Sequence, residues 1–310
     1  MCALAFPAVF VFLILTPVAT KAQTPTSCPA GIELKISAPQ TSQGNLLRVE
    51  FRNLASLREV KGTWAGHDVS FWEDNANTNI QRAFLGVDLD QSPGPGRLAI
   101  TAKQKNGEDV TCSADITVKA GHFVVERLTV DQKFVTPNAE DQARVEKEGQ
   151  RVHDIYAART PEKMWGGEFR FPLSGSRRGS NFGSRRILNG EARSPHSGLD
   201  IHAATGTPVH AAQRGRVVLA EELYYAGNAI ILDHGMGVYT FYGHLSKINV
   251  KEGDIVDAGA LIGLVGATGR VTGPHLHWGL EVNEARVNPL QILPPPPTPK
   301  KPRAAAQPPK

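Results

Sequence analysis

The chain has 310 residues, of which 41% are hydrophobic and 21% are charged. This length suits two domains of ordinary size, and this composition excludes a wholly disordered chain. The formal net charge of +4 falls to −1 when Lys21 and the four basic residues of the last eleven positions are left out, namely Lys300, Lys301, Arg303 and Lys310. The remaining residues lack the net positive charge that is typical of nucleic-acid-binding proteins, so we expect no nucleic-acid partner.

Residues 1–22 are predicted to be a secretory signal peptide. The run at residues 6–15, FPAVFVFLIL, is almost wholly apolar, and small residues follow it up to Ala22. This run is too short to span a bilayer, which needs about 20 apolar residues. No Lys or Arg precedes it, and an amphipathic or buried N-terminal helix is the alternative. We expect an exported protein that is not integral to the membrane, and a periplasmic rather than a secreted one because no anchor or wall-binding repeat is recognisable.

Residues 23–125 show the alternation of half-buried β-strands. Apolar residues recur at every second position in four stretches: 32–36, 47–51, 98–102 and 110–118. Asn106-Gly107 between the last two stretches is a strong hairpin signal. Short strands at this spacing predict a β-sandwich, plausibly immunoglobulin-like.

Two cysteines are expected to form a disulfide bond in this predicted sandwich. Cys2 lies in the predicted signal peptide, which leaves Cys28 and Cys112 as a pair in an oxidising compartment. Two unrelated buried thiols are the alternative. The bond would join the first and last strands of the sandwich.

Residues 126–168 are predicted to be a helical linker. Pro137-Asn138 is a helix-start signal, and a thin apolar stripe follows, so we expect one charged helix over residues 138–158 that is interrupted or weakened at Gly149. Residues 294–310 are rich in proline and basic residues, and we expect an extended, disordered tail there.

Residues 169–293 are glycine-rich and β-like again, and seven of the ten histidines lie between positions 196 and 277. In an extended segment side chains alternate between two faces, so His196 and Asp200 share one face and so do His275 and His277. Imidazole and carboxylate are good zinc ligands, and three protein ligands leave a fourth position for water. Each pair alone is a modest signal, but together, with Tyr242-Gly243-His244 between them, they indicate a metal site.

Residues 181–290 resemble the lysostaphin/LytM-type zinc metalloendopeptidases, a family that hydrolyses peptide bonds in bacterial peptidoglycan. The matching stretches keep the family's order and spacing, and they are NFGSRR from Asn181, SPHSGLD from Ser194, GTPV from Gly206, GRVV from Gly215, ILDHG from Ile231, YGHLS from Tyr242, KEGDIV from Lys251, GLVGATGRVTGPHLHW from Gly263 and VNPL from Val287. The resemblance implies an antiparallel β domain with the metal in an open groove. Residues 23–168 resemble, more loosely, the N-terminal module attached to one branch of the family.

The resemblance also implies roles for individual residues. His196, Asp200 and His277 would bind one Zn²⁺ per chain, and a metal-bound water would attack the peptide bond. His244 and His275 would be catalytic, with His275 favoured as the general base and His244 as the group that stabilises the developing oxyanion. Asn181 and His210 are candidates for substrate contact.

The other histidines are expected to be structural or exposed, and two pairs of arginines are expected to be solvated. They are the isolated His67, His122 and His153, then His202 and His234 near the site, and the pairs Arg177-Arg178 and Arg185-Arg186. The arginine pairs have a second interpretation, in which they hold a carboxylate of a peptidoglycan stem peptide.

The predicted function is therefore hydrolysis of peptide bonds in peptidoglycan stem or crosslink peptides. The alternative is a catalytically silent or latent peptidoglycan-binding module that activates another wall hydrolase, in which the helical linker or the β-sandwich covers the groove.

Overall fold

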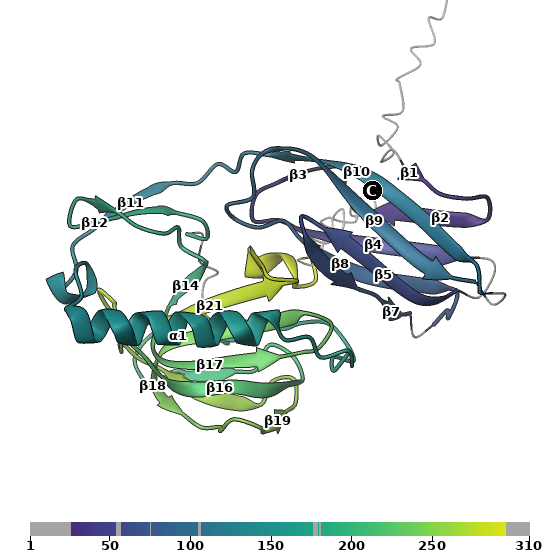
Figure 1. The fold of residues 1–310 in the computed structure, drawn as a ribbon. Helices are drawn as coiled ribbons and strands as arrows, with labels where there is room; N and C mark the ends of the chain where they lie inside the picture. The colour runs from purple at the N-terminus through teal and green to yellow at the C-terminus, as the bar shows by residue number, and fades with distance from the viewer. Residues whose placement is uncertain are drawn as a thin grey trace, which may run out of the picture.

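The computed structural model describes residues 26–53, 57–74, 76–104, 107–175, 179 and 181–295. The predicted signal peptide, most of the predicted tail and the pair Arg177-Arg178 lie outside the described residues. Strands predominate, and α1 (Ala139–Ala157) is the one α-helix within these residues. The predicted mainly β class is confirmed. Figure 1 shows a β module at the N-terminal end, and a second β module that α1 lies against.

The N-terminal module consists of two sheets that share one core. The first sheet contains β1 (Thr26–Ser27), β3 (Gln40–Ser42), β5 (Arg58–Trp64), β6 (His67–Ser70), β9 (Gly94–Lys103) and β10 (Asp109–Lys119). The second contains β2 (Ile32–Ile36), β4 (Leu46–Asn53), β7 (Trp72–Glu73) and β8 (Ile80–Gly86). The predicted alternation is present, since every second side chain of β10, from Val110 to Val118, is buried. The likeness to the immunoglobulin fold stays a prediction.

A disulfide bond joins Cys28 and Cys112, as predicted. Cys28 follows β1, which pairs with β10, and Cys112 lies in β10. The bond therefore fixes the short first strand to the longest strand of its sheet.

Removal of this bond is expected to destabilise the N-terminal module. A Cys28→Ser/Cys112→Ser variant should lose about 2–5 kcal/mol of unfolding free energy, because the reduced chain is freed from a long closed loop. Chemical denaturation followed by tryptophan fluorescence checks this, with the reduced wild-type protein as the comparison. Equal midpoints for the oxidised wild type and the variant would contradict it.

The helix α1 runs through Gly149 without a break. The predicted interruption is therefore wrong, and the other expectation, that Gly149 weakens the helix, stays a prediction. A glycine in a helix costs only about 1 kcal/mol relative to alanine, and burial of the apolar stripe opposes that cost. Val152, Ile155 and Tyr156 pack against a buried cluster on the second module. The predicted helix start is present, because Asn138 Oδ1 accepts a hydrogen bond from the backbone of Asp141.

The second module is built on a nine-stranded sheet in which every pair is antiparallel. Its strands are β14 (Gly198–His202), β15 (Pro208–His210), β16 (Gly215–Leu223), β17 (Gly227–Asp233), β18 (Val238–Ile248), β19 (Ile255–Val256), β20 (Leu261–Val265), β21 (His275–Val282) and β22 (Ala285–Val287). A smaller sheet contains β11 (Val125–Leu128), β12 (Arg185–Leu188) and β13 (Glu191–Ala192), with β11 parallel to β12. Two short 3-10 helices, η1 (Gln132–Phe134) and η2 (Pro289–Gln291), complete the elements.

Strand β21 has one face in the core of the module, and its other face is on the side of the sheet that α1 covers. Leu276, Trp278 and Leu280 are at most 2% exposed and belong to the main core cluster of the module. The alternate positions, which begin with His275 and His277, therefore face the other way. The helix α1 lies across this side of the sheet (Figure 1).

The two modules are packed against each other. Leu46 and Leu89 of the N-terminal module lie in the core cluster of the second module. Arg286 donates two hydrogen bonds to the Asp88 carboxylate, at 3.0 and 2.6 Å. The modules are thus joined by buried apolar contacts and a bidentate ion pair. None of the helices in the described ranges has the length and apolar character that a membrane span requires.

Candidate metal centre

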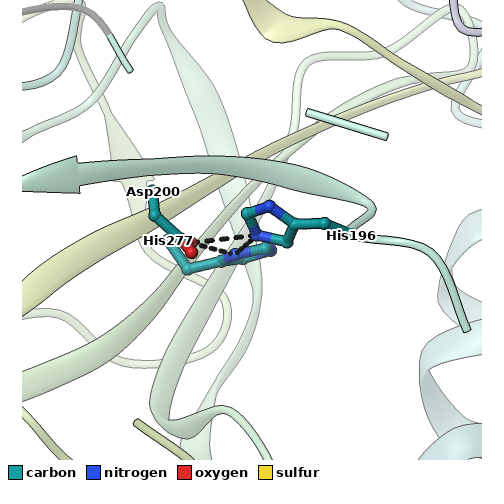
Figure 2. A group of neighbouring side chains, drawn as sticks. All are labelled: His196, Asp200 and His277. Carbon is teal, nitrogen blue, oxygen red and sulfur yellow. Dashed lines mark hydrogen bonds and ion pairs between the residues drawn. The ribbon is translucent and has the colours of Figure 1, made fainter. Parts of the chain in front are cut away.

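Three side chains converge on one point beside β14 and β21 (Figure 2). His196 Nε2 lies 2.9 Å from His277 Nδ1 and 2.9 Å from Asp200 Oδ1. The third side of the triangle, from His277 Nδ1 to Asp200 Oδ1, measures 3.0 Å. The structure therefore brings together the three predicted metal ligands, two of them separated by 77 residues in the sequence.

The strand register explains this convergence. Asp200 and His277 are directly opposite each other in the antiparallel pair β14–β21, so their side chains stand next to each other on one face. His196 lies just before β14, and its side chain is almost completely buried. Gly198 leaves room for this packing, since a Cβ there would lie 2.6 Å from His277 Nε2.

The donor set and its spacing fit a zinc ion. His196 Nδ1 is 3.1 Å from the carbonyl oxygen of Asn181, and donation of a hydrogen bond there leaves the Nε2 lone pair pointing at the other two atoms. Zinc bonds of about 2.0–2.1 Å in a tetrahedron place ligand atoms about 3.3 Å apart, a little more than the observed separations. Two nitrogen atoms and one carboxylate oxygen would leave a fourth position open.

The electrostatics keep the ligands in the forms that bind metal. Burial acts to raise the pKa of Asp200, but its close contacts with the imidazole rings of His196 and His277 outweigh it and hold that pKa well below its usual range. Burial lowers the pKa of His277 to about 4. At neutral pH the aspartate is therefore ionised and this histidine is neutral, as metal binding requires.

Two further residues hold the second oxygen of the Asp200 carboxylate. Asn181 Nδ2 donates to Asp200 Oδ2 at 3.0 Å, and Arg186 Nη2 donates to the same atom at 3.1 Å. Asn181 Oδ1 also accepts from the backbone N–H of Asp200 at 3.0 Å. These contacts orient the carboxylate so that Oδ1 faces the two histidines.

The expectation that Arg186 is solvated is wrong. Its side chain is 19% exposed, and it lies between Asp200 and Glu126, 3.8 Å from the latter. The parallel pairing of β11 with β12 brings Glu126 and Arg186 side by side. Its neighbour Arg185 is 41% exposed and pairs with Asp90.

Loss of the Asn181 side chain is expected to weaken zinc binding. An Asn181→Ala variant should bind zinc about 10–100-fold less tightly, because an outer partner of a ligand orients it. Competition with a chromophoric chelator measures the affinity, and Asn79→Ala, at an exposed site of the N-terminal module, is the control. Equal affinities of Asn181→Ala and wild type would show that Arg186 alone suffices to orient Asp200.

The two predicted catalytic histidines lie next to the three ligands. The ring centroid of His244 is 4.8 Å from that of His275 and 5.9 Å from that of His277. Nδ1 of His244 is 2.9 Å from the carbonyl oxygen of Thr268, and Nδ1 of His275 is 2.8 Å from that of Gly273. Both rings are thus anchored through Nδ1. Nε2 of His244 is left for a substrate or water, and Nε2 of His275 lies 3.6 Å from Asp200 Oδ1.

The backbone at His244 is strained. Its φ angle is +62°, in the left-handed region that non-glycine residues rarely adopt. Its N–H donates to the carbonyl oxygen of Ala226 at 2.8 Å, and burial lowers the pKa of its side chain to about 3. Such strain costs about 1–3 kcal/mol and is often found at functional sites.

Residues 194–289, which include all five of these histidine and aspartate positions, match the family model of peptidase family M23. A peptidoglycan DD-endopeptidase, ShyA of Vibrio cholerae, is 34% identical over 245 residues, which is 76% of this chain and 55% of that protein. Residues 194–289 form a domain of peptidase family M23. The predicted resemblance is confirmed.

A further relative and a solved structure are also similar to this chain. A DD-carboxypeptidase/endopeptidase, Mpg of Neisseria meningitidis, is 40% identical over 126 residues, or 41% of this chain and 29% of that protein. A Pseudomonas aeruginosa crystal structure described as a peptidase M23 protein covers 81% of this chain and 94% of its own, with a TM-score of 0.63 and 28% identity. The chain spans about half the length of ShyA and a smaller part of Mpg.

Three other histidines of the M23 domain are not among these five residues, and one of them, His202, lies beside His275 with 6.1 Å between the ring centroids. His234 is buried and bonded through both ring nitrogens, to the carbonyl oxygen of Arg214 and to Thr240. His202 is exposed on β14. His210 lies on β15 and does not line the cavity beside the metal centre. Substrate contact by His210 and by Asn181 stays a prediction.

The metal centre of the M23 domain opens onto a cavity of about 470 Å³. Its lining includes side chains from the sheet and from α1, among them His196, His244 and His277, and Val152, His153 and Tyr156. The helix of the predicted linker is therefore one wall of the site. The helix α1 therefore borders the cavity beside the ligands but does not fill it.

Proposed function

We propose that this chain is an exported, zinc-dependent endopeptidase that hydrolyses peptide bonds in bacterial peptidoglycan. The observation that carries the proposal is the convergence of His196, Asp200 and His277 within 3.0 Å of one another beside a cavity. Membership of family M23 and the names of the relatives support it.

His196, Asp200 and His277 would hold one zinc ion per chain. When bound, zinc lowers the pKa of a coordinated water to about 7 and polarises a carbonyl oxygen. Asn181 and Arg186 keep Asp200 Oδ1 turned toward the two histidines. His196 keeps its lone pair in place through its hydrogen bond to the Asn181 carbonyl.

His275 and His244 would move the protons of the reaction. His275 Nε2 lies 3.6 Å from Asp200 Oδ1, so a base at this atom is beside the ligands and can take a proton from the attacking water. His244 lies on the neighbouring strand β18, and its Nδ1–H donates to the Thr268 carbonyl oxygen. Its Nε2 would take up a proton during the reaction, and the protonated ring would then stabilise charge on the carbonyl oxygen or give that proton to the leaving amine. The hydrogen bonds do not distinguish the two rings, since each is anchored through Nδ1.

The substrate would be a crosslink or stem peptide of peptidoglycan. ShyA and Mpg are named as DD-endopeptidase and DD-carboxypeptidase/endopeptidase, and we infer a crosslink bond for this chain by that likeness. Such a substrate lies outside the cytoplasm. The apolar run at residues 6–15 and the Cys28–Cys112 disulfide support export. The proposed location is the periplasm, and secretion is the alternative.

The experiment is hydrolysis of purified peptidoglycan by the full chain, followed by mass spectrometry of the released muropeptides. We expect crosslinked dimers to disappear and monomers to appear, with the glycan strands intact. A chelator should stop the reaction, and added zinc should restore it. Removal of residues 23–165 is a poor variant, because it would uncover the apolar cluster under α1.

The same experiment tests the alternative of a silent binding module. Such a module would sediment with peptidoglycan but release no new muropeptides, with or without zinc. Hydrolysis would exclude it. The intact set of five site residues favours the enzyme.

A further inference from the structure

Arg270 stands out among the cavity residues because it carries a charge without a counter-ion. It lies in the loop between β20 and β21 and lines the same cavity as His196, His244 and His277. Within the described residues, no acidic side chain lies within 4.0 Å of its guanidinium. The other arginines that line this cavity are paired, Arg186 with Asp200 and Arg286 with Asp88. Arg193, which lies close to Arg270, is paired with Glu191.

The position of Arg270 is fixed by its surroundings. Its backbone N–H donates to the carbonyl oxygen of Tyr225 at 2.8 Å, and its guanidinium carbon lies 4.3 Å from the centre of the Tyr225 ring. One guanidinium nitrogen is 3.5 Å from the carbonyl oxygen of Phe134, which is a long contact. A planar group stacked on an aromatic ring keeps its edge free for a ligand.

Arg270 is largely buried from solvent, and other positively charged side chains lie near it. Burial lowers the pKa of Arg270, and the nearby charges of Arg186 and Arg193 lower it further. A charge taken out of water is costly unless it is paired. A bound zinc ion would add positive charge to the same cavity. An anion that enters the site would therefore be held strongly.

We propose that Arg270 is a specificity residue that binds a free carboxylate of the substrate peptide next to the scissile bond. This inference rests on the proposed function. Guanidinium binds carboxylate through two parallel hydrogen bonds, which fixes position as well as charge. Stem and crosslink peptides of peptidoglycan carry free carboxylates, whereas an ordinary neutral peptide segment offers only amide groups. The residue thus selects peptides with a carboxylate at one position.

The test compares two substrates and two proteins. The substrates are a crosslinked muropeptide dimer with a free carboxylate beside the crosslink, and the same dimer with that carboxylate amidated. The proteins are the full wild-type chain and Arg270→Gln. We expect wild type to favour the carboxylate substrate by about 10–100-fold in kcat/KM, the range for a hydrogen bond to a charged group. Arg270→Gln should reduce this preference to less than 3-fold, mainly through a higher KM for the carboxylate substrate.

Two further variants separate recognition from structure. Arg270→Lys keeps the charge and should retain part of the preference, while Arg193→Gln removes a nearby charge that is paired with Glu191 and should leave most of the preference in place. The inference would be overturned if Arg270→Gln lowered kcat/KM equally on both substrates, or if wild type showed no preference between them. Should wild type cleave neither dimer, the proposed function itself would fail, which is a distinct outcome. The wild-type comparison stands even if a variant does not fold.

Discussion

An Asp200→Asn variant is expected to lose hydrolysis of peptidoglycan by about 10³-fold or more. The substitution keeps the size of the side chain but removes its negative charge and the oxygen that faces His196 and His277 at 2.9 and 3.0 Å. Zinc contributes several kcal/mol of transition-state stabilisation, and about 1.4 kcal/mol corresponds to a tenfold change in rate. Release of soluble muropeptides measures the effect.

The matched control for this prediction is Asp257→Asn. Asp257 is on the same module, its side chain is 79% exposed, and it pairs with Arg214 on the surface. This variant should retain wild-type activity. Undiminished activity of Asp200→Asn would remove Asp200 from the proposed ligand set.

A His275→Ala variant is expected to keep its zinc and to lose activity by about 10²–10⁴-fold, the usual contribution of a general acid or base. The three proposed ligands do not include His275, and the ring is anchored separately on the carbonyl oxygen of Gly273. The zinc content and kcat of the same preparation should both be measured. The combination of bound metal and lost turnover is what distinguishes a catalytic residue from a ligand.

The control here is His122→Ala, which removes an exposed histidine of the chain far in sequence from the M23 domain. It should behave as wild type. Loss of zinc in His275→Ala would make His275 a ligand, and wild-type turnover would remove it from the mechanism.

The ligand set could be predicted from the sequence because it depends on local periodicity. His275 and His277 share a face of β21 by the two-residue repeat, and the buried Leu276 and Trp278 fix which face that is. The family resemblance then linked this pair to His196 and Asp200. The β-sandwich strands and the helix start at Asn138 were predictable for the same reason, since each is marked by neighbouring residues.

The surroundings of the site could not be predicted because they depend on contacts between distant segments. Arg186 reaches Asp200 and Glu126 only because β11 and β12 pair in parallel. The continuity of α1 through Gly149 depends on the apolar cluster that its stripe covers. Nothing in the neighbourhood of Arg270 in the sequence indicates that it lacks a counter-ion.

The zinc content of the purified chain tests the central claim most directly. Wild type, purified without added metal and analysed by inductively coupled plasma mass spectrometry, should contain one zinc per chain. His277→Ala, with an unchanged circular dichroism spectrum, should contain almost none. Equal zinc in both proteins, or none in wild type after incubation with zinc, would contradict the account.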